Sequence, residues 1–302
     1  MEPIKIGLIG GTGLGQALDG QNNGQRHDIE TPFGKPSDAI VQTQWAGLEV
    51  LILSRHGPGH LLNPTQVPYR ANIFALKQLG CTHIIASGAV GSLREEFKPR
   101  DLVIADQLID KTSRRAGTFF ESAAVHVEFA EPFCPVLRRM LLEAGQSMQA
   151  DSKGAGVHDR GCYVCMEGPA FSTRAESLMH RLWGGDLIGM TAMPEAKLAR
   201  EAEISYALVA LVTDYDCWRG SAGPGASVDP AALLKEILGN VEAATANAVE
   251  LVRRTVALMA KSQTELADCP ARQALSRAIW SDKSRIPPDH VQRLSPLWMK
   301  YF

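Results

Sequence analysis

Two aspartates, Asp214 and Asp216, lie two positions apart in the segment Thr-Asp-Tyr-Asp-Cys-Trp. They follow residues 204–212, a short apolar run typical of a buried strand. Because side chains alternate along a strand, both carboxylates are expected on one side of its end. Two neighbouring carboxylates there need hydrogen-bond donors, which a ligand with N–H groups supplies. The alternative interpretation is an acidic loop that caps the next helix.

A second candidate is the segment Arg-His-Gly-Pro-Gly-His, which begins at Arg55 and His56. A guanidinium group binds phosphate through two parallel hydrogen bonds. No Asp or Glu stands at ligand spacing from the histidines, so no metal site is predicted. The alternative is an exposed polar loop.

Two segments of small residues follow predicted strands. Residues 10–15 are rich in glycine, but Gln16 occupies the third glycine position of a dinucleotide-binding fingerprint, so that function is not predicted. The backbone N–H groups and the Thr12 hydroxyl can instead bind a small anion, although a simple tight turn is the alternative. Residues 87–92 are interpreted as a second small-residue loop that a ligand can approach closely.

Residues 167–173 contribute an aromatic ring, Phe171, and a hydroxyl, Ser172. Phe171 can stack on a base, and its alternative place is the core. Met190 and Thr191 close another predicted strand. An anion site, an aromatic platform and paired carboxylates at strand ends together suit a nucleoside and phosphate.

Predicted strands alternate with predicted helices, which indicates an α/β fold. The strands are expected at 4–9, 41–53 (a hairpin), 83–86, 102–104, 161–166, 187–191 and 204–212, and the helices at 72–79, 136–144, 175–183, 193–202, 230–260 and 269–280. We expect one domain at 1–260 and an extension at 261–302 that packs on it. The segment 219–227 is interpreted as a lid or a linker.

Composition restricts the function further. The chain has 302 residues, 45% of them hydrophobic, and a formal net charge of −2. This balance argues against nucleic acid or a membrane as the main partner. No apolar run reaches the length of a membrane span, and no signal peptide is recognised, so a cytoplasmic location is expected. The six cysteines are interpreted as buried structural thiols, including the pair Cys162 and Cys165.

With these residues considered, the chain resembles the 5′-methylthioadenosine phosphorylases of the purine nucleoside phosphorylase superfamily over about residues 4–260. The resemblance rests on a series of motifs in the expected order. They lie at 10–14, 55–57, 69–72, 91–96, 130–135, 166–169, 172–177, 190–191 and 213–218.

This resemblance implies an α/β domain with a mixed, partly barrel-like sheet surrounded by helices, usually assembled as a homotrimer. It implies phosphate-dependent cleavage of 5′-methylthioadenosine to adenine and 5-methylthioribose 1-phosphate, a reaction of purine and methionine salvage. Inorganic phosphate is the co-substrate, and no cofactor or metal is expected. The phosphate-binding positions implied are Thr12, Arg55, His56, Ala89 and Thr191. The substrate-binding positions implied are Phe171, Ser172, Met190, Thr213, Asp214, Asp216, Val228, Ala232 and, across a subunit interface, His126.

The chemistry of these positions is consistent with that reaction. The leaving purine gains negative charge, which a protonated Asp214 at N7 relieves, and Asp216 raises the pKa of Asp214 by like-charge repulsion. Carboxylates also accept from a 6-amino group. The chain differs from the family pattern at Gly88, where a Thr is usual, and at Ala232, where a Leu is usual. The alternative functions are a phosphorylase of 6-oxopurine nucleosides or methylthioinosine and a non-catalytic nucleoside-binding protein.

Overall fold

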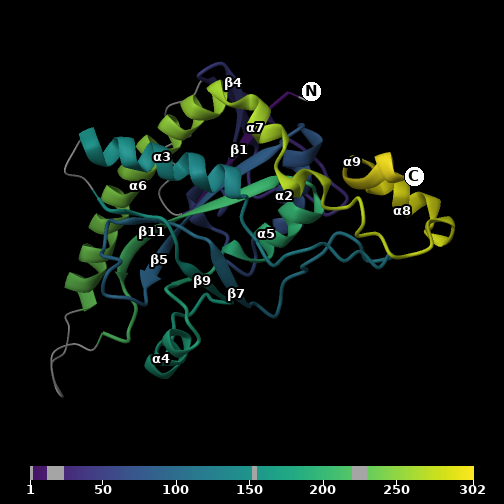
Figure 1. The fold of residues 1–302 in the computed structure, drawn as a ribbon. Coiled ribbons are helices and arrows are strands. Elements are labelled where there is room, and N and C mark those ends of the chain that lie inside the picture. The colour runs from purple at the N-terminus through teal and green to yellow at the C-terminus, as the bar shows by residue number, and fades with distance from the viewer. Residues whose placement is uncertain (1–2, 12–23, 152–154, 220–229) are drawn as a thin grey trace.

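A mixed sheet of 11 strands forms the centre of the computed structural model, which describes residues 3–11, 24–151, 155–219 and 230–302 (Figure 1). At residues 230–234 only the helical backbone is described. The central strands are β1 (Lys5–Gly10), β4 (Leu48–Ser54), β5 (His83–Ser92) and β11 (Ser205–Tyr215). Each is parallel to its neighbour in the order β4-β1-β5-β11. The apolar runs predicted as buried strands therefore form the middle of the sheet.

The remaining strands extend this centre. They are β2 (Gln25–His27), β3 (Ile40–Trp45), β6 (Leu102–Ile104), β7 (Gln107–Lys111), β8 (Val157–His158), β9 (Cys162–Met166) and β10 (Leu187–Gly189). The main path runs β2-β3-β4-β1-β5-β10-β9-β7, and β11 leads from β5 to β6 and β8. The predicted α/β class and mixed sheet are confirmed, and the sheet does not close into a barrel.

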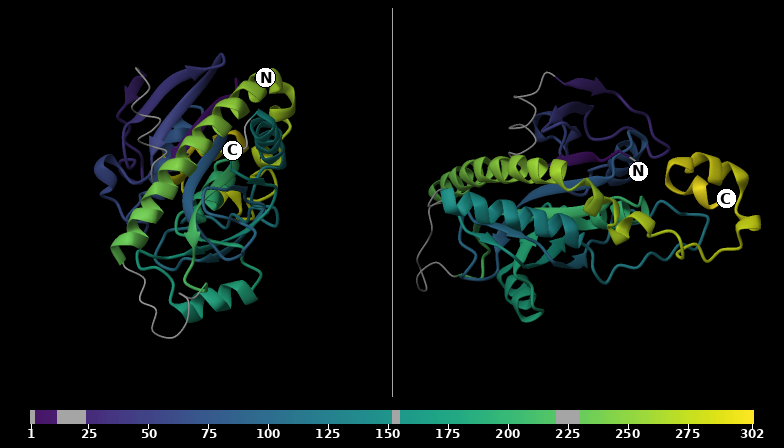
Figure 2. Two further views of the ribbon diagram at one scale, coloured as in Figure 1. Left: turned by 90° about the vertical axis from the view of Figure 1, so that its left-hand side faces the viewer. Right: turned by 45° about the horizontal axis from the view of Figure 1, so that its top comes forward.

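Helices cover both faces of the sheet (Figure 2). On one face, α3 (Pro135–Asp151) and α6 (Pro230–Lys261) bury apolar residues against β1, β4 and β11. On the other face lie α2 (Tyr69–Gln78) and α5 (Ala192–Glu201). The helix α4 (Arg174–Leu182) lies at the lower edge in Figure 1. Several helices thus start or end beside the strand ends that carry the candidate residues.

The C-terminal tail starts against α3 and α6 on the first face, up to Ala271, and from Leu275 onward it packs on the second face. The tail contains α7 (Gln263–Ala267), α8 (Pro288–Arg293) and α9 (Ser295–Trp298). It also contains short 3-10 turns at Pro270–Gln273, Lys283–Arg285 and Met299–Tyr301, whereas the turn at Pro58–His60 lies outside it. Trp298 is buried with its ring 4.6 Å from that of Phe120. The helix predicted at 269–280 is wrong. Ala271, Leu275 and Ala278 are buried at helix-like spacing, but Ile279 instead pairs as an isolated bridge with Val125.

The prediction of a loop at 87–92 is also wrong, because β5 continues as a strand to Ser92. The segment has hydrogen-bonded neighbours on both sides, β11 along its length and β10 at Gly91 and Ser92. A run of small side chains is typical of a loop. In this segment, the small side chains instead allow the neighbouring strands to approach closely within the sheet. The strand β11 likewise extends past Val212 to Tyr215.

Four further interpretations of the sequence concern membrane spans, cysteines, metal ligands and the segment 219–227. Within the described ranges, no helix is both long and apolar enough to cross a membrane. Four cysteines are buried and Cys162 is half-buried, but Cys217 is exposed, so its interpretation as a buried thiol is wrong. No group of His, Cys, Asp or Glu suited to a metal ion occurs among the residues described. The segment 219–227 lies outside them except for Arg219.

Candidate active site

The carboxyl ends of four parallel strands meet at one edge of the sheet. Gly10 ends β1, Ser54 ends β4 just before Arg55, and Asp214 lies near the end of β11. Ser87 and Gly88 lie within β5 between these positions. In open α/β sheets, ligands bind beside this edge. The fold therefore brings together residues that are far apart in the sequence.

Arg55 is completely buried and is held by a carboxylate that sequence reasoning missed. Its Nε and Nη2 donate to the two oxygens of Glu195 at 2.8 and 2.9 Å, and Nη1 donates to Ser87 O at 2.7 Å. Glu195 is also 0% exposed and accepts from Tyr206 Oη at 2.8 Å. Burial alone would lower the pKa of Arg55, but Glu195 outweighs burial and raises it. Since guanidinium has five N–H groups, two make no hydrogen bond to the described residues and can serve a ligand.

Backbone without side chains lies directly beside this pair. A Cβ atom at Gly11 would be 2.7 Å from Ser87 O and 2.9 Å from Arg55 Nη1, so only glycine fits there. A Cβ atom at Gly88 would lie 3.4 Å from Thr191 Oγ1. The hydroxyl of Thr191 makes no capping bond to α5. These five residues therefore form a small polar corner, called here the anion corner, that contains a guanidinium group able to bind an anion. Ala89 follows Gly88 in β5, opposite Leu211.

His56 lies next to this corner in a defined protonation state. Its Nδ1 is 2.7 Å from Leu62 O, and since a carbonyl only accepts, Nδ1 carries the proton. Burial and then the charge of Arg55 lower the pKa of His56 to about 4. The imidazole is therefore neutral at pH 7, and Nε2 is an acceptor. The ring stacks on His60 with centroids 4.2 Å apart.

The two aspartates lie together over a glycine of β5. A Cβ atom at Gly91 would be 3.3 Å from both Asp214 Oδ1 and Asp216 Cβ. The side chains thus share one side of the strand end, as expected from alternation. Thr213 Oγ1 lies 2.6 Å from Asp214 Oδ2 and 3.2 Å from Val90 O.

The environment of Asp214 favours its protonated form. Burial is the main cause that raises its pKa, and the charges of Asp216 and Glu236 raise it further, against the hydrogen bond from Thr213. A carboxyl whose pKa is raised is better able to donate a proton to a leaving group. Asp216 N donates to Ser92 O at 3.0 Å, while its Oδ2 is buried without a hydrogen-bond partner among the residues described.

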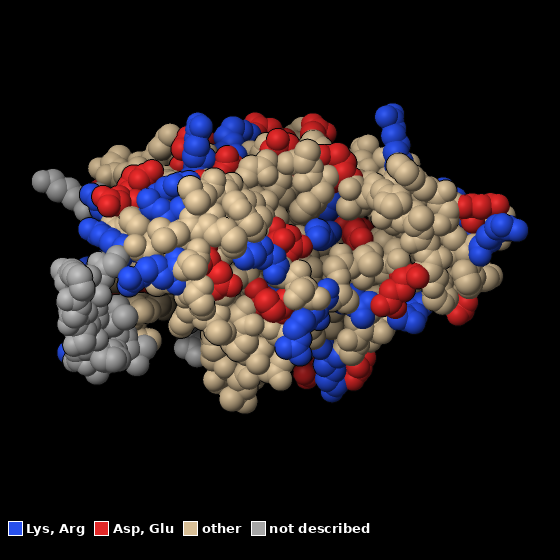
Figure 3. Space-filling model, turned by 90° about the horizontal axis from the view of Figure 1, so that it is seen from below, with Lys and Arg blue, Asp and Glu red and all other residues tan. Residues whose placement is uncertain are grey.

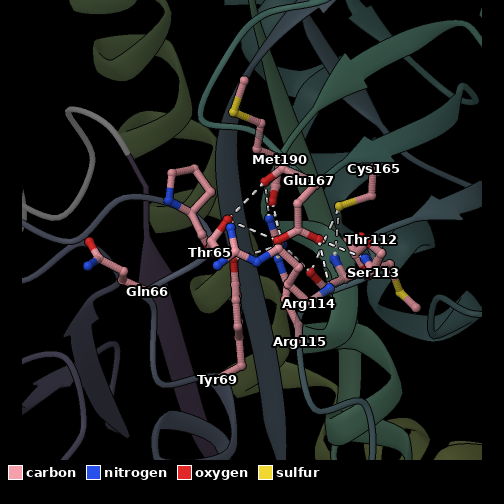
Figure 4. Close-up of polar contacts among 12 residues, drawn as sticks. Thr65, Gln66, Tyr69, Thr112, Ser113, Arg114, Arg115, Cys165, Glu167 and Met190 are labelled. Atoms are coloured by element: carbon pink, nitrogen blue, oxygen red, sulfur yellow. Dashed lines mark hydrogen bonds and ion pairs between the residues drawn. The ribbon is translucent and has the colours of Figure 1, made fainter.

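Arg115 connects three segments around the site and was not found from the sequence (Figure 4). Its side chain, 2% exposed, donates to the carbonyls of Met190, Met193 and Glu167, each at 2.6 Å. Its Nε lies 3.2 Å from Glu167 Oε1. Arg115 lies in irregular chain without periodicity, so no sequence pattern indicates this role. It fixes Met190 relative to the 167–173 segment.

The 167–173 segment lies beside both Met190 and the aspartates. A Cβ atom at Gly168 would be 2.5 Å from Met190 Sδ, so these chains touch. Ser172 O accepts from Cys217 Sγ at 3.3 Å, next to Asp216. Phe171 is 85% exposed, which excludes its alternative place in the core.

The remaining candidate residues lie elsewhere or outside the description. His126 N donates to Ala278 O at 2.9 Å, and its ring lies 4.6 Å from that of Trp280 in the C-terminal tail. Thr12 and Val228 are outside the described residues. Ala232 lies in the first turns of α6, where only the backbone is described.

Comparison with known families agrees with this arrangement. The family model described as "Phosphorylase superfamily" matches residues 5–257. The chain belongs to this superfamily, whose members include enzymes of the purine nucleoside phosphorylase type.

Several relatives have more specific names. The chain is 47% identical to an S-methyl-5′-thioadenosine phosphorylase of Geobacter sulfurreducens, with 97% of each chain covered. It is 44% identical to one of a Synechocystis species, with 98% of this chain and 87% of the relative covered. A solved methylthioadenosine phosphorylase from an antarctic soil metagenomic library has a TM-score of 0.85 and 44% identity, covering 98% of this chain and 99% of that one. The enzyme of Schistosoma mansoni in complex with adenine has a TM-score of 0.81 and 35% identity, covering 92% and 99%.

Proposed function

We propose that this protein is a 5′-methylthioadenosine phosphorylase, which uses inorganic phosphate to release adenine and 5-methylthioribose 1-phosphate. The observation that carries the proposal is the aspartate pair over Gly91, on the same strand edge as the corner formed by Gly11, Arg55 and Thr191. The names of its relatives support the same reaction. Recovery of adenine and the methylthio sugar places the reaction in purine and methionine salvage.

Each half of the site has a separate task. Arg55 and the small residues bind phosphate near C1′, where its negative charge stabilises the positive charge that develops on the ribose. Asp214 donates its proton to N7 as the glycosidic bond breaks, so that adenine leaves as a neutral base. Phosphate oxygen forms the new bond to C1′, and no other cofactor takes part. Met190, fixed by Arg115, lines the ribose.

The two carboxyl groups favour a 6-aminopurine. Asp216 can accept a hydrogen bond from the exocyclic amine, whereas a 6-oxo group would present an acceptor to a buried carboxylate. Nothing in the described geometry favours the 6-oxopurine alternative.

Release of free base decides between these functions. The protein is incubated with methylthioadenosine, adenosine, methylthioinosine or inosine, each with and without phosphate. We expect adenine from methylthioadenosine only when phosphate is present. Release at an equal rate without phosphate would identify a hydrolase. No release from any substrate, with binding retained, would indicate a nucleoside-binding protein.

We further propose a cytoplasmic homotrimer in which His126 completes the site of a neighbouring subunit. Large apolar side chains that remain exposed support an assembly: Trp280, 72% exposed beside His126, and Phe171, Leu178 and Leu182 at the α4 end. Seen from below, the molecule carries uncharged areas between scattered charged side chains (Figure 3). Sedimentation gives the oligomeric state. Mixed trimers of His126→Ala and Asp214→Asn subunits should exceed the weighted mean activity of the parents, and a strict mean would refute sharing in trans.

A further inference from the structure

The helix α4 turns polar residues inward and apolar residues outward. Its buried side chains are Ser177 and His180, whereas Leu178 and Leu182 are exposed. Apolar residues usually occupy the buried positions of a helix. The inward face of α4 therefore packs against polar groups. These groups belong to the residues that follow Asp214.

Two contacts and one electrostatic interaction connect α4 to residues 216–218. The Ser177 side chain faces the Cys217 thiol, and the Arg181 guanidinium lies 3.6 Å above the ring of Trp218. His180 lies between these two positions on the same helix face and interacts electrostatically with Asp216. His180 is thus close enough to respond to the charge of Asp216, the carboxylate that we expect to meet the purine amine.

Lys111 determines which nitrogen of His180 carries the proton. Its Nζ is 2.9 Å from His180 Nε2. Because an ammonium group only donates, Nε2 accepts, and a neutral imidazole then has its hydrogen on Nδ1. Burial and then Lys111 lower the pKa of His180, which keeps it neutral near pH 7.

Three buried polar atoms at this place complement one another. Among the residues described, His180 Nδ1 and Asp216 Oδ2 lack a hydrogen-bond partner, and the Ser177 hydroxyl has none besides the Cys217 thiol. Buried polar atoms are nearly always paired, through ordered water where protein atoms do not reach. A donor, an acceptor and a hydroxyl are a sufficient set of partners for one bridging water.

We propose that His180 is a positioning residue for base recognition, which holds Asp216 Oδ2 through one ordered water and is itself oriented by Lys111. The inference rests on the proposed function, since it assigns Asp216 to the purine amine. With Oδ2 held, Asp216 presents its other oxygen to the 6-amino group. The charge of Asp216 also contributes to the raised pKa of Asp214.

Charged and titratable groups from several elements act on His180 and Asp216 in the part of the chain that the structure describes. Lys111, Asp216 and Glu176 act on His180, and Asp214, His180 and Cys217 act on Asp216. A substitution at His180 should therefore change how Asp216 binds the purine amine. Through the charge of Asp216, it should also change the pH dependence of proton donation by Asp214.

Three substitutions at one position test the proposal. His180→Phe keeps the ring but removes both nitrogens. His180→Asn places an amide donor near the position of Nδ1, and His180→Gln places its amide near Nε2, facing Lys111. The matched control is His158→Phe, because His158 makes a separate pair with Asp101 at 2.8 Å. The measured quantity is the ratio of kcat/KM for methylthioadenosine to that for methylthioinosine, with the pH profile of kcat and the melting temperature.

We expect His180→Phe and His180→Gln to lower this ratio roughly 10-fold to 100-fold, the value of a hydrogen bond to a charged group. His180→Asn should keep most of the ratio, and His158→Phe all of it. The inference is overturned if all three His180 variants retain the wild-type ratio. It is also overturned if all three lose stability and both activities equally, since that is a purely structural role. If His180→Phe does not fold, the comparison of Asn with Gln decides. Failure of the wild-type protein to cleave methylthioadenosine would instead refute the proposed function.

Discussion

The buried pair of Arg55 and Glu195 predicts the effect of Glu195→Ala. Both side chains are 0% exposed, and two parallel hydrogen bonds join them. The substitution leaves the guanidinium charge buried without its counter-ion. Removing one partner of a buried ion pair typically costs about 3–5 kcal/mol.

The corresponding change in melting temperature follows from the length of the chain. Unfolding entropy of about 2.1 cal/mol/K per residue gives roughly 0.6 kcal/mol/K for 302 residues. A loss of about 3–5 kcal/mol therefore lowers the melting temperature by roughly 5–8 °C. Differential scanning calorimetry at pH 7 measures it, and a shift of less than about 1 °C would refute the argument.

A double variant separates stability from function. Arg55→Met with Glu195→Leu replaces the whole pair by apolar groups, so its stability should recover relative to Glu195→Ala. It should nevertheless bind phosphate poorly, because the cation is gone. Glu195→Gln keeps the shape but places an amide N–H against Arg55, and we expect an apparent KM for phosphate about 10-fold higher. An unchanged KM would mean that Glu195 does not orient Arg55 for phosphate.

Three further predictions concern other residues. Asp214→Asn should lower kcat on methylthioadenosine by roughly 100-fold or more, because general-acid assistance is worth that much; full activity would exclude Asp214 as the acid. Gly88→Thr should tighten phosphate binding several-fold, about 1 kcal/mol, because the added Cβ has van der Waals room beside Thr191 and brings a hydroxyl; isothermal titration with phosphate checks this, and weaker binding would contradict it. Burial raises the pKa of Glu201 from 4.5 to about 7, so its stabilising contribution is complete below pH 4.5 and is lost as the pH rises through about 7, by up to about 3 kcal/mol. Glu201→Gln should flatten this decline in a series of urea unfolding curves, and an unchanged slope would show that another group titrates.

The central parallel strands could be predicted from the sequence because they are buried on both faces. The runs at β1, β4 and β11 are almost wholly apolar, and the predicted boundaries differ from the observed ones by a few residues. The pairing of Asp214 and Asp216 over one side of the strand end followed from simple alternation.

Residues that act through distant partners could not be found in this way. Glu195 lies 140 positions from Arg55, and Arg115 is 75 positions from Met190. His180 faces inward on a helix whose apolar residues are exposed, so the usual assignment of a buried face is reversed. Each of these roles depends on the packing of elements rather than on local pattern.

The strand β11 pairs with β5 and also carries the proposed acid, Asp214. A bulge in β11 explains how it can do both. Val212 pairs with Val90 and Asp214 pairs with Gly91, so Thr213 is an extra residue on the β11 side. In a regular ladder, Thr213 would stand opposite Gly91, and Asp214 would lie opposite Ser92. Shifting the pairing by one residue exchanges the two faces of a strand, and bulges commonly re-aim a side chain beside an active site. The bulge thus directs Asp214 over Gly91, one of the two glycines of β5. Gly88 lies three residues earlier in β5, about 10 Å away along the strand. The distance between the anion corner and Asp214 is therefore set by the pairing register of β5 and β11. It does not depend on the conformation of a loop.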